Sequence, residues 1–133
     1  MSASLYGPSE ESMEIWVFLE QEEGQLLHVS LELLHKGREM ADRMGWLLCG
    51  LLPGNGVSSL TEKAFAGGAD RVLLAEHPLL EQFTIDAYGR VVFQAVMQFK
   101  PSIFLLGATH NGRDLAARLA VRRLESRRRR SPT

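Results

Sequence analysis

The stretch KPSIFLLGATHNGRDLAARLA, residues 100–120, decides the fold class of this chain. The apolar run at 102–106 is typical of a buried parallel strand, and residues 107–112 form a loop of small and polar residues. From Arg113 and Asp114 onward, apolar residues recur at the spacing of a helix. The order of strand, tight turn and helix indicates an α/β domain, in which ligands and partners are met at the carboxyl ends of the strands.

Three similar units precede this stretch. Each has an apolar run followed by a segment of helical period, with Ser30 as a candidate N-cap and Ser59 with Glu62 as a candidate capping box. The alternation predicts an α/β fold, an open parallel sheet with helices on both faces, arranged as a Rossmann-like three-layer sandwich. Periodicity leaves the strand order open. The predicted strands are 14–20, 46–52 and 71–75, and the predicted helices start at Ser30, Ser59 and Thr84.

Charge is divided unevenly along the 133 residues, a length that fits one domain. Residues 1–112 hold seven lysines and arginines against fourteen acids, a formal charge of −7. Residues 113–133 hold eight arginines against two acids, a charge of +6, so that the chain totals −1. We expect a flexible lead-in at 1–12, one domain at 13–124 and a basic disordered tail at 125–133.

The sequence offers no signal for secretion or for membrane insertion. Residues 1–13 lack the basic start and apolar core of a signal peptide, and no apolar run approaches the roughly 20 residues of a membrane span. The single cysteine, Cys49, lies in an apolar run and is expected to be a buried, inert thiol. We therefore expect a cytoplasmic protein, or one of the mitochondrial matrix if the source is eukaryotic.

The segment GATHNGRDLAARLA, residues 107–120, resembles one found in the α subunit of electron transfer flavoproteins, the FixB family. Further pieces agree in order and spacing: VSLELL at 29–34, GADRV at 68–72 and KPSI at 100–103. Glu20 and the PLL triplet at 78–80 also fit the pattern. The likeness runs from about Met13 to about Arg123 and stops after Leu124.

The resemblance implies an adenine nucleotide alpha hydrolase-like fold and the N-terminal domain of an α subunit, truncated before the FAD-binding domain. Proteins of that family form an FAD-containing αβ heterodimer. They carry electrons from acyl-CoA and related dehydrogenases, as in fatty acid β-oxidation, to a quinone oxidoreductase or another acceptor. The missing domain makes most of the flavin contacts. We therefore expect a structural and docking portion that packs on the β subunit, is not an enzyme and binds no cofactor alone.

The loop before the last helix holds the candidate binding residues Gly107, Thr109, Asn111, Gly112 and Arg113. Backbone N–H groups near Gly112 are suited to an anion or a nucleotide phosphate, with Arg113 as counter-ion. The alternative is that both glycines only permit a tight strand-to-helix turn, while Thr109 and Asn111 bond their own backbone. The sequence leaves both interpretations open.

Other patterns favour structure over chemistry. The glycines at 53–56 lack the Lys-Ser/Thr pair of a phosphate-binding loop, and the four histidines are too scattered for one metal ion. The arginines at 127–130 have no interleaved aromatic residues, so we expect no specific nucleic-acid binding. Two rival functions stay open: a free-standing adenine-nucleotide-binding module of the universal-stress type, and a non-functional truncated product.

Overall fold

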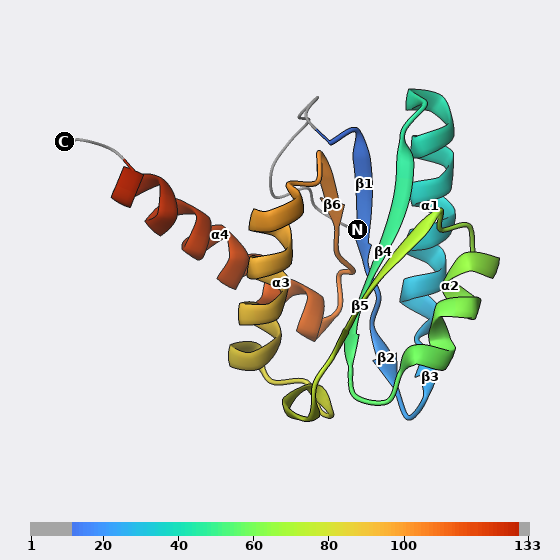
Figure 1. Ribbon diagram of the computed structural model, residues 1–133, viewed down its shortest axis with the longest axis horizontal. Coiled ribbons are helices and arrows are strands. Elements are labelled where there is room, and N and C mark those ends of the chain that lie inside the picture. Colours follow the sequence, from blue (N-terminus) through green and yellow to red (C-terminus); the bar gives the residue numbers. More distant parts are fainter. Residues whose placement is uncertain (1–11, 131–133) are drawn as a thin grey trace.

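The computed structural model describes residues 12–130 and has a four-stranded parallel sheet at its centre. The strand order is β5-β4-β1-β6, and a small antiparallel hairpin, β2-β3, stands beside it. Helices α1 and α2 cover one face of the sheet, and α3 and α4 lie on the other (Figure 1). The predicted open α/β sandwich is confirmed. The strands are β1 (Glu14–Phe18), β2 (Gln21–Glu22), β3 (Gln25–Leu26), β4 (Leu47–Gly54), β5 (Arg71–Glu76) and β6 (Ile103–Leu105).

Each face of the sheet has its own apolar core because the strands alternate side chains between the two helical layers. Ile15, Val17 and Leu19 pack under α1 and α2, while Trp16 and Phe18 pack under α3 and α4. The helices are α1 (His28–Met44), α2 (Thr61–Ala66), α3 (Ile85–Phe99) and α4 (His110–Arg130), with short 3₁₀ turns η1 (Ser58–Leu60) and η2 (Pro78–Leu80).

Strand β4 continues through Pro53 and Gly54, whereas the predicted strand ended at residue 52. The carbonyl of Leu51 accepts from Leu19 at 2.9 Å, whereas that of Gly54 accepts from His77 on the opposite side at 3.1 Å. Because the backbone hydrogen-bonding groups of successive residues alternate between the two neighbouring strands, those of Pro53 point towards the side of β1. Strand β1 has already ended there, since its last pair is Phe18 with Leu51. The proline therefore removes no hydrogen bond from the sheet, and the strand can include it.

Two predicted helix caps are wrong. Helix α1 begins at His28 after Leu27, which makes no side-chain cap bond, so Ser30 lies inside the first turn. Ser59 lies within η1, and α2 begins after Leu60, again with no side-chain cap bond. Ser30 is fully buried and serves a tertiary contact instead.

Helix α4 differs from its prediction at both ends. It starts at His110, before Arg113, and it continues through Arg130, so the expected disordered tail is helical over most of its length. Its last fully buried apolar residue is Leu119, after which it runs away from the sheet (Figure 1). Residues 131–133 of the expected tail and residues 1–11 of the expected lead-in lie outside the described part of the chain.

Candidate functional site: the cleft at the carboxyl ends of the strands

The chain changes direction across the sheet between β1 and β6. From β1 it proceeds outward to β4 and β5, and then crosses back to place β6 on the other side of β1. In open α/β sheets this reversal opens a crevice between the loops that follow the two strands, and ligands bind there. Glu20 follows β1 and Thr109 follows β6, so both residues stand at this point.

A hydrogen-bonded network closes the crevice from within. The hydroxyl of Thr109 donates to the Glu20 carboxylate, with distances of 2.8 and 3.0 Å to its two oxygens. The same hydroxyl oxygen accepts from the backbone N–H of Gly112 at 2.9 Å. The Thr109 carbonyl accepts from the N–H of Arg113, also at 2.9 Å. The backbone N–H groups of Gly112 and Arg113, which were predicted to hold an anion, therefore donate to Thr109 instead. The Thr109 hydroxyl in turn donates to the Glu20 carboxylate.

The glycines of this loop are required by close packing. A side-chain carbon on Gly112 would collide with the carbonyl oxygen of Gly107. One on Gly107 would lie 2.7 Å from a methyl of Val29 and 3.2 Å from the Glu20 carboxylate. The loop is therefore packed directly against the start of α1 and the end of β1. This supports the tight-turn interpretation of the two glycines.

The Glu20 backbone is anchored as firmly as its side chain. The Ser30 hydroxyl donates to the Glu20 carbonyl at 2.8 Å and accepts from the Glu20 N–H at 2.7 Å. The same carbonyl accepts from the N–H of Leu27 at 2.9 Å. Ser30 was missed as a site residue because its helical position suggested a cap. A buried serine in the first turn of a helix, close after a strand, is the signal that would have found it.

Burial raises the pKa of Glu20, and the hydrogen bond from Thr109 lowers it in part. The raised pKa means that the folded chain binds this proton more tightly than the unfolded chain does. The ionised carboxylate therefore costs stability at neutral pH. That cost is relieved as the pH falls through the folded pKa, and it is gone below the ordinary value of 4.5.

We expect Glu20→Gln to unfold at higher urea concentration than the unmodified chain at pH 7, because glutamine still accepts from Thr109 without a buried charge. The advantage should shrink as the pH is lowered towards 4.5. Urea unfolding at a series of pH values measures this. Glu22→Gln is the matched control, since that side chain is exposed on the same rim. A difference for Glu20→Gln that stays constant with pH would contradict the assignment.

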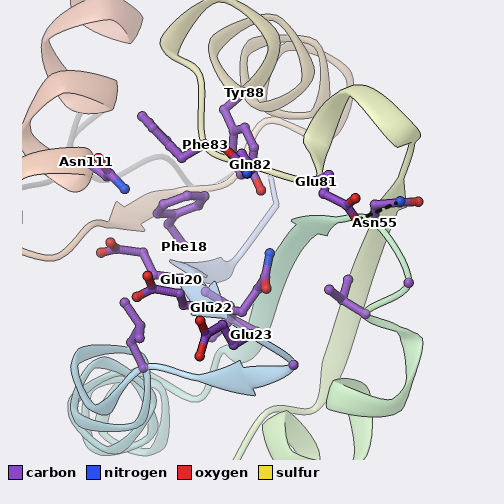
Figure 2. Close-up of a pocket in the computed structure, with 16 residues that line it drawn as sticks. Phe18, Glu20, Glu22, Glu23, Asn55, Glu81, Gln82, Phe83, Tyr88 and Asn111 are labelled. Carbon is purple, nitrogen blue, oxygen red and sulfur yellow. Dashed lines mark hydrogen bonds between the residues drawn. The ribbon is translucent and has the colours of Figure 1, made fainter.

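Beyond this network lies an open cleft of about 690 Å³. It is lined by residues from the β1–β2 connection, the β2-β3 hairpin, the loop after β4, the η2–α3 loop and the start of α4, and Figure 2 shows their side chains around it. The hairpin turns at Glu23 and Gly24, both with positive φ, so its acidic tip stands at the rim. Among the described lining residues are Glu20, Glu22, Glu23 and Glu81, and none is lysine, arginine or histidine.

The five predicted site residues are only partly brought together. Thr109, Gly107 and Gly112 form the closed network, whereas Asn111 lines the open cleft. Arg113 is exposed and is not among the residues that line the cleft. Binding of an anion by these residues stays a prediction, and the acidic surroundings oppose it.

The other candidate residues take structural positions. Cys49 is fully buried, and this burial, the largest cause, raises the pKa of its thiol to about 11. Three exposed histidines stand within 3.6 Å of an acid one helical turn later, and His77 caps η2 by accepting from Leu79. Across residues 12–130 no three His, Cys, Asp or Glu side chains cluster as metal ligands would. No helix in that same range is both long enough and apolar enough to cross a bilayer.

Comparison with known proteins decides the family. The family model described as electron transfer flavoprotein domain matches residues 15–123, which include every strand except the first residue of β1. The chain belongs to the electron transfer flavoprotein domain family. The resemblance to the α subunit is also confirmed by the relatives.

Curated relatives of this chain align over about four fifths of its length. The chain is 44% identical over 109 residues to the acryloyl-CoA reductase electron transfer subunit beta of Anaerotignum propionicum. It is 44% identical over 108 residues to the electron transfer flavoprotein subunit alpha of Clostridium acetobutylicum, and 46% identical over 108 residues to the protein FixB of Clostridium saccharobutylicum. The matched regions are 30–32% of the length of these relatives, so the chain spans about a third of each.

Proposed function

We propose that this chain is the structural and docking portion of an electron transfer flavoprotein α subunit, and that it packs on a β subunit in an FAD-containing heterodimer. The observation that carries the proposal is the closed network of Glu20, Thr109 and Gly112. It fills the position where an open α/β sheet would otherwise hold a nucleotide. The family membership supports a β subunit as the partner and FAD as the cofactor of the heterodimer.

The described residues do not fit a flavin dinucleotide. A pyrophosphate at the crevice would approach the Glu20 carboxylate, and the cleft beyond it holds further carboxylates and no basic side chain. The N–H of Gly112 is bonded to Thr109. This supports the view that FAD is held elsewhere in the heterodimer, while this domain contributes surface. In such a complex the cofactor carries the redox step, and this chain supplies none of the reacting groups.

Electron transfer from a CoA-ester-linked dehydrogenase system is the activity we propose for the complete heterodimer. One relative is named as an electron transfer subunit of acryloyl-CoA reductase. Another, 36% identical, is named as a subunit of a lactate dehydrogenase using NAD(+) and ferredoxin. The proposed function therefore covers a carrier role that is shared by systems with different donors. We place it in the cytoplasm, or in the mitochondrial matrix of a eukaryote.

Two measurements test the proposal. Co-expression with an electron transfer flavoprotein β subunit should yield a complex that co-purifies. Titration calorimetry of the isolated chain with AMP and with ATP should give no saturable heat. A micromolar affinity that is lost in Arg113→Ala, but kept in the control Arg90→Ala on α3, would instead favour the nucleotide-binding module. Arg90 is exposed, as Arg113 is, and lies on a different helix.

A further inference from the structure

The second half of α4 combines many arginines with two exposed apolar residues, and only its first part borders α3, where Arg122 lies over the ring of Phe93 at 5.6 Å. Val121 is 53% exposed and Leu124 is 60% exposed, although both are apolar and lie one turn apart. Beyond Asp114 the helix contains one acid, Glu125, and the sequence continues with arginine at 127–130. An exposed apolar pair within a strongly cationic helix is suited to a partner site that has apolar residues at its base and carboxylates at its rim.

The cleft at the carboxyl ends of the strands offers that combination. Glu22, Glu23 and Glu81 are exposed at its rim. Leu27 and Phe83, which are half-buried, contribute apolar lining. Its volume of about 690 Å³ is within the range of pockets that enclose a ligand. The cleft therefore has room for the ends of several side chains of an incoming helix.

The basic end of α4 cannot reach the cleft of its own molecule. Asn111, in the first turn of α4, lines the cleft, and the helix runs from there to Arg130. At 1.5 Å per residue its 21 residues span about 30 Å, and Figure 1 shows α4 leading away from the β2-β3 hairpin. A continuous helix holds the two surfaces apart. Like charges also oppose the pairing of two α4 ends with each other.

We propose that the basic end of α4 docks in the acidic cleft of a second copy of this chain. The support for this docking is charge complementarity, because residues 1–112 carry a formal charge of −7 and residues 113–133 a charge of +6. The contact is head-to-tail, because two different surfaces meet. Each added copy presents a free cleft at one end and a free α4 at the other. The chain therefore forms open oligomers whose size depends on concentration and on salt.

Sedimentation equilibrium of the full chain tests this. At about 0.1 M salt the mean mass should exceed 14.9 kDa and rise with concentration, and at about 1 M salt it should return to 14.9 kDa. Glu22→Gln with Glu23→Gln should weaken association roughly tenfold. The control, Glu39→Gln with Glu62→Gln, removes the same charge from exposed positions on α1 and α2 and should leave association unchanged.

A mixing experiment separates head-to-tail docking from other contacts. The cleft variant (E22Q, E23Q) keeps its α4, and a tail variant (R127Q, R128Q, R129Q, R130Q) keeps its cleft. At about 0.1 M salt and a concentration near the dissociation constant of the wild-type chain, each variant alone should be close to monomeric. An equimolar mixture should form a complex that stops at one copy of each. Association that is insensitive to salt, or that persists in both variants alone, would overturn the proposal and indicate pairing through the sheet edges. A wild-type chain that stays monomeric at low salt would overturn it too.

Discussion

Gly112→Ala is expected to destabilise the domain by about 3 kcal/mol. The new side-chain carbon would collide with the backbone carbonyl oxygen of Gly107, and it would also lie 3.0 Å from the Thr109 hydroxyl. A backbone atom cannot rotate away as a side chain can, so the start of α4 must move. That movement would break the bond from Gly112 to Thr109 and expose the buried Glu20 carboxylate. Urea unfolding followed by circular dichroism measures the loss.

Gly89→Ala is the matched control, because Gly89 is also a buried helical glycine. There the added carbon would meet only a flexible methylene of Arg118, at 3.3 Å. Alanine is favoured over glycine inside a helix by about 1 kcal/mol, which offsets that close contact. We expect a change within about 1 kcal/mol of zero. If Gly112→Ala were as stable as this control, the closed loop would not have the packing described here.

Trp16→Ala is expected to cost about 4 kcal/mol of unfolding free energy. Trp16 is fully buried in the central strand and packs against Phe104 and Phe99, each with a ring-centre distance of 6.0 Å. Its indole N–H donates to the buried carboxylate of Glu14 at 2.9 Å, and Glu14 also pairs with Arg71 at 2.9 Å. Alanine would leave a cavity at the centre of the sheet and remove one partner of a buried acid.

Two variants separate these contributions. Trp16→Phe keeps most of the ring volume and loses the indole N–H, so we expect a cost of about 1–2 kcal/mol. Trp46→Ala removes the other tryptophan, which is half-buried at the edge of the core under α1, and should cost less than half as much as Trp16→Ala. Equal losses for the two tryptophan-to-alanine variants would mean that the central strand is not the centre of the core.

The local elements could be predicted from the sequence because their signals are local. Alternating apolar runs and helical stripes depend on which face of each element is buried, and nearly all the predicted strands and helices are present. The misplaced caps have a common cause. A serine side chain bonds whichever backbone group lies nearest, and for Ser30 this is the backbone of Glu20, in the connection between β1 and β2. The helical end at 125–130 was missed because an arginine run is typical of a disordered tail as well as of an exposed helix.

The candidate site was predictable only in part. The turn at 107–112 was found from its glycines, and its position after a strand correctly pointed to the carboxyl edge of the sheet. Glu20 was recognised only as a matching residue of the family pattern, and the acidic rim of the cleft was not foreseen. Residues such as Glu22 and Glu81 are far apart in the chain, and no spacing rule connects them.

By itself the sequence determined the layered α/β architecture and the uneven distribution of charge, since both follow from composition and local order. Its motifs indicated the family by resemblance, which the comparisons confirmed. Only the tertiary structure decided what the loop after β6 does. The strand order sets β6 beside β1, and this brings Thr109 within hydrogen-bonding distance of a carboxylate 89 positions earlier. Residues so far apart meet only when the chain crosses back over the sheet. Because of that crossing, the loop that resembled a nucleotide-binding turn is closed by its hydrogen bonds to the Glu20 carboxylate.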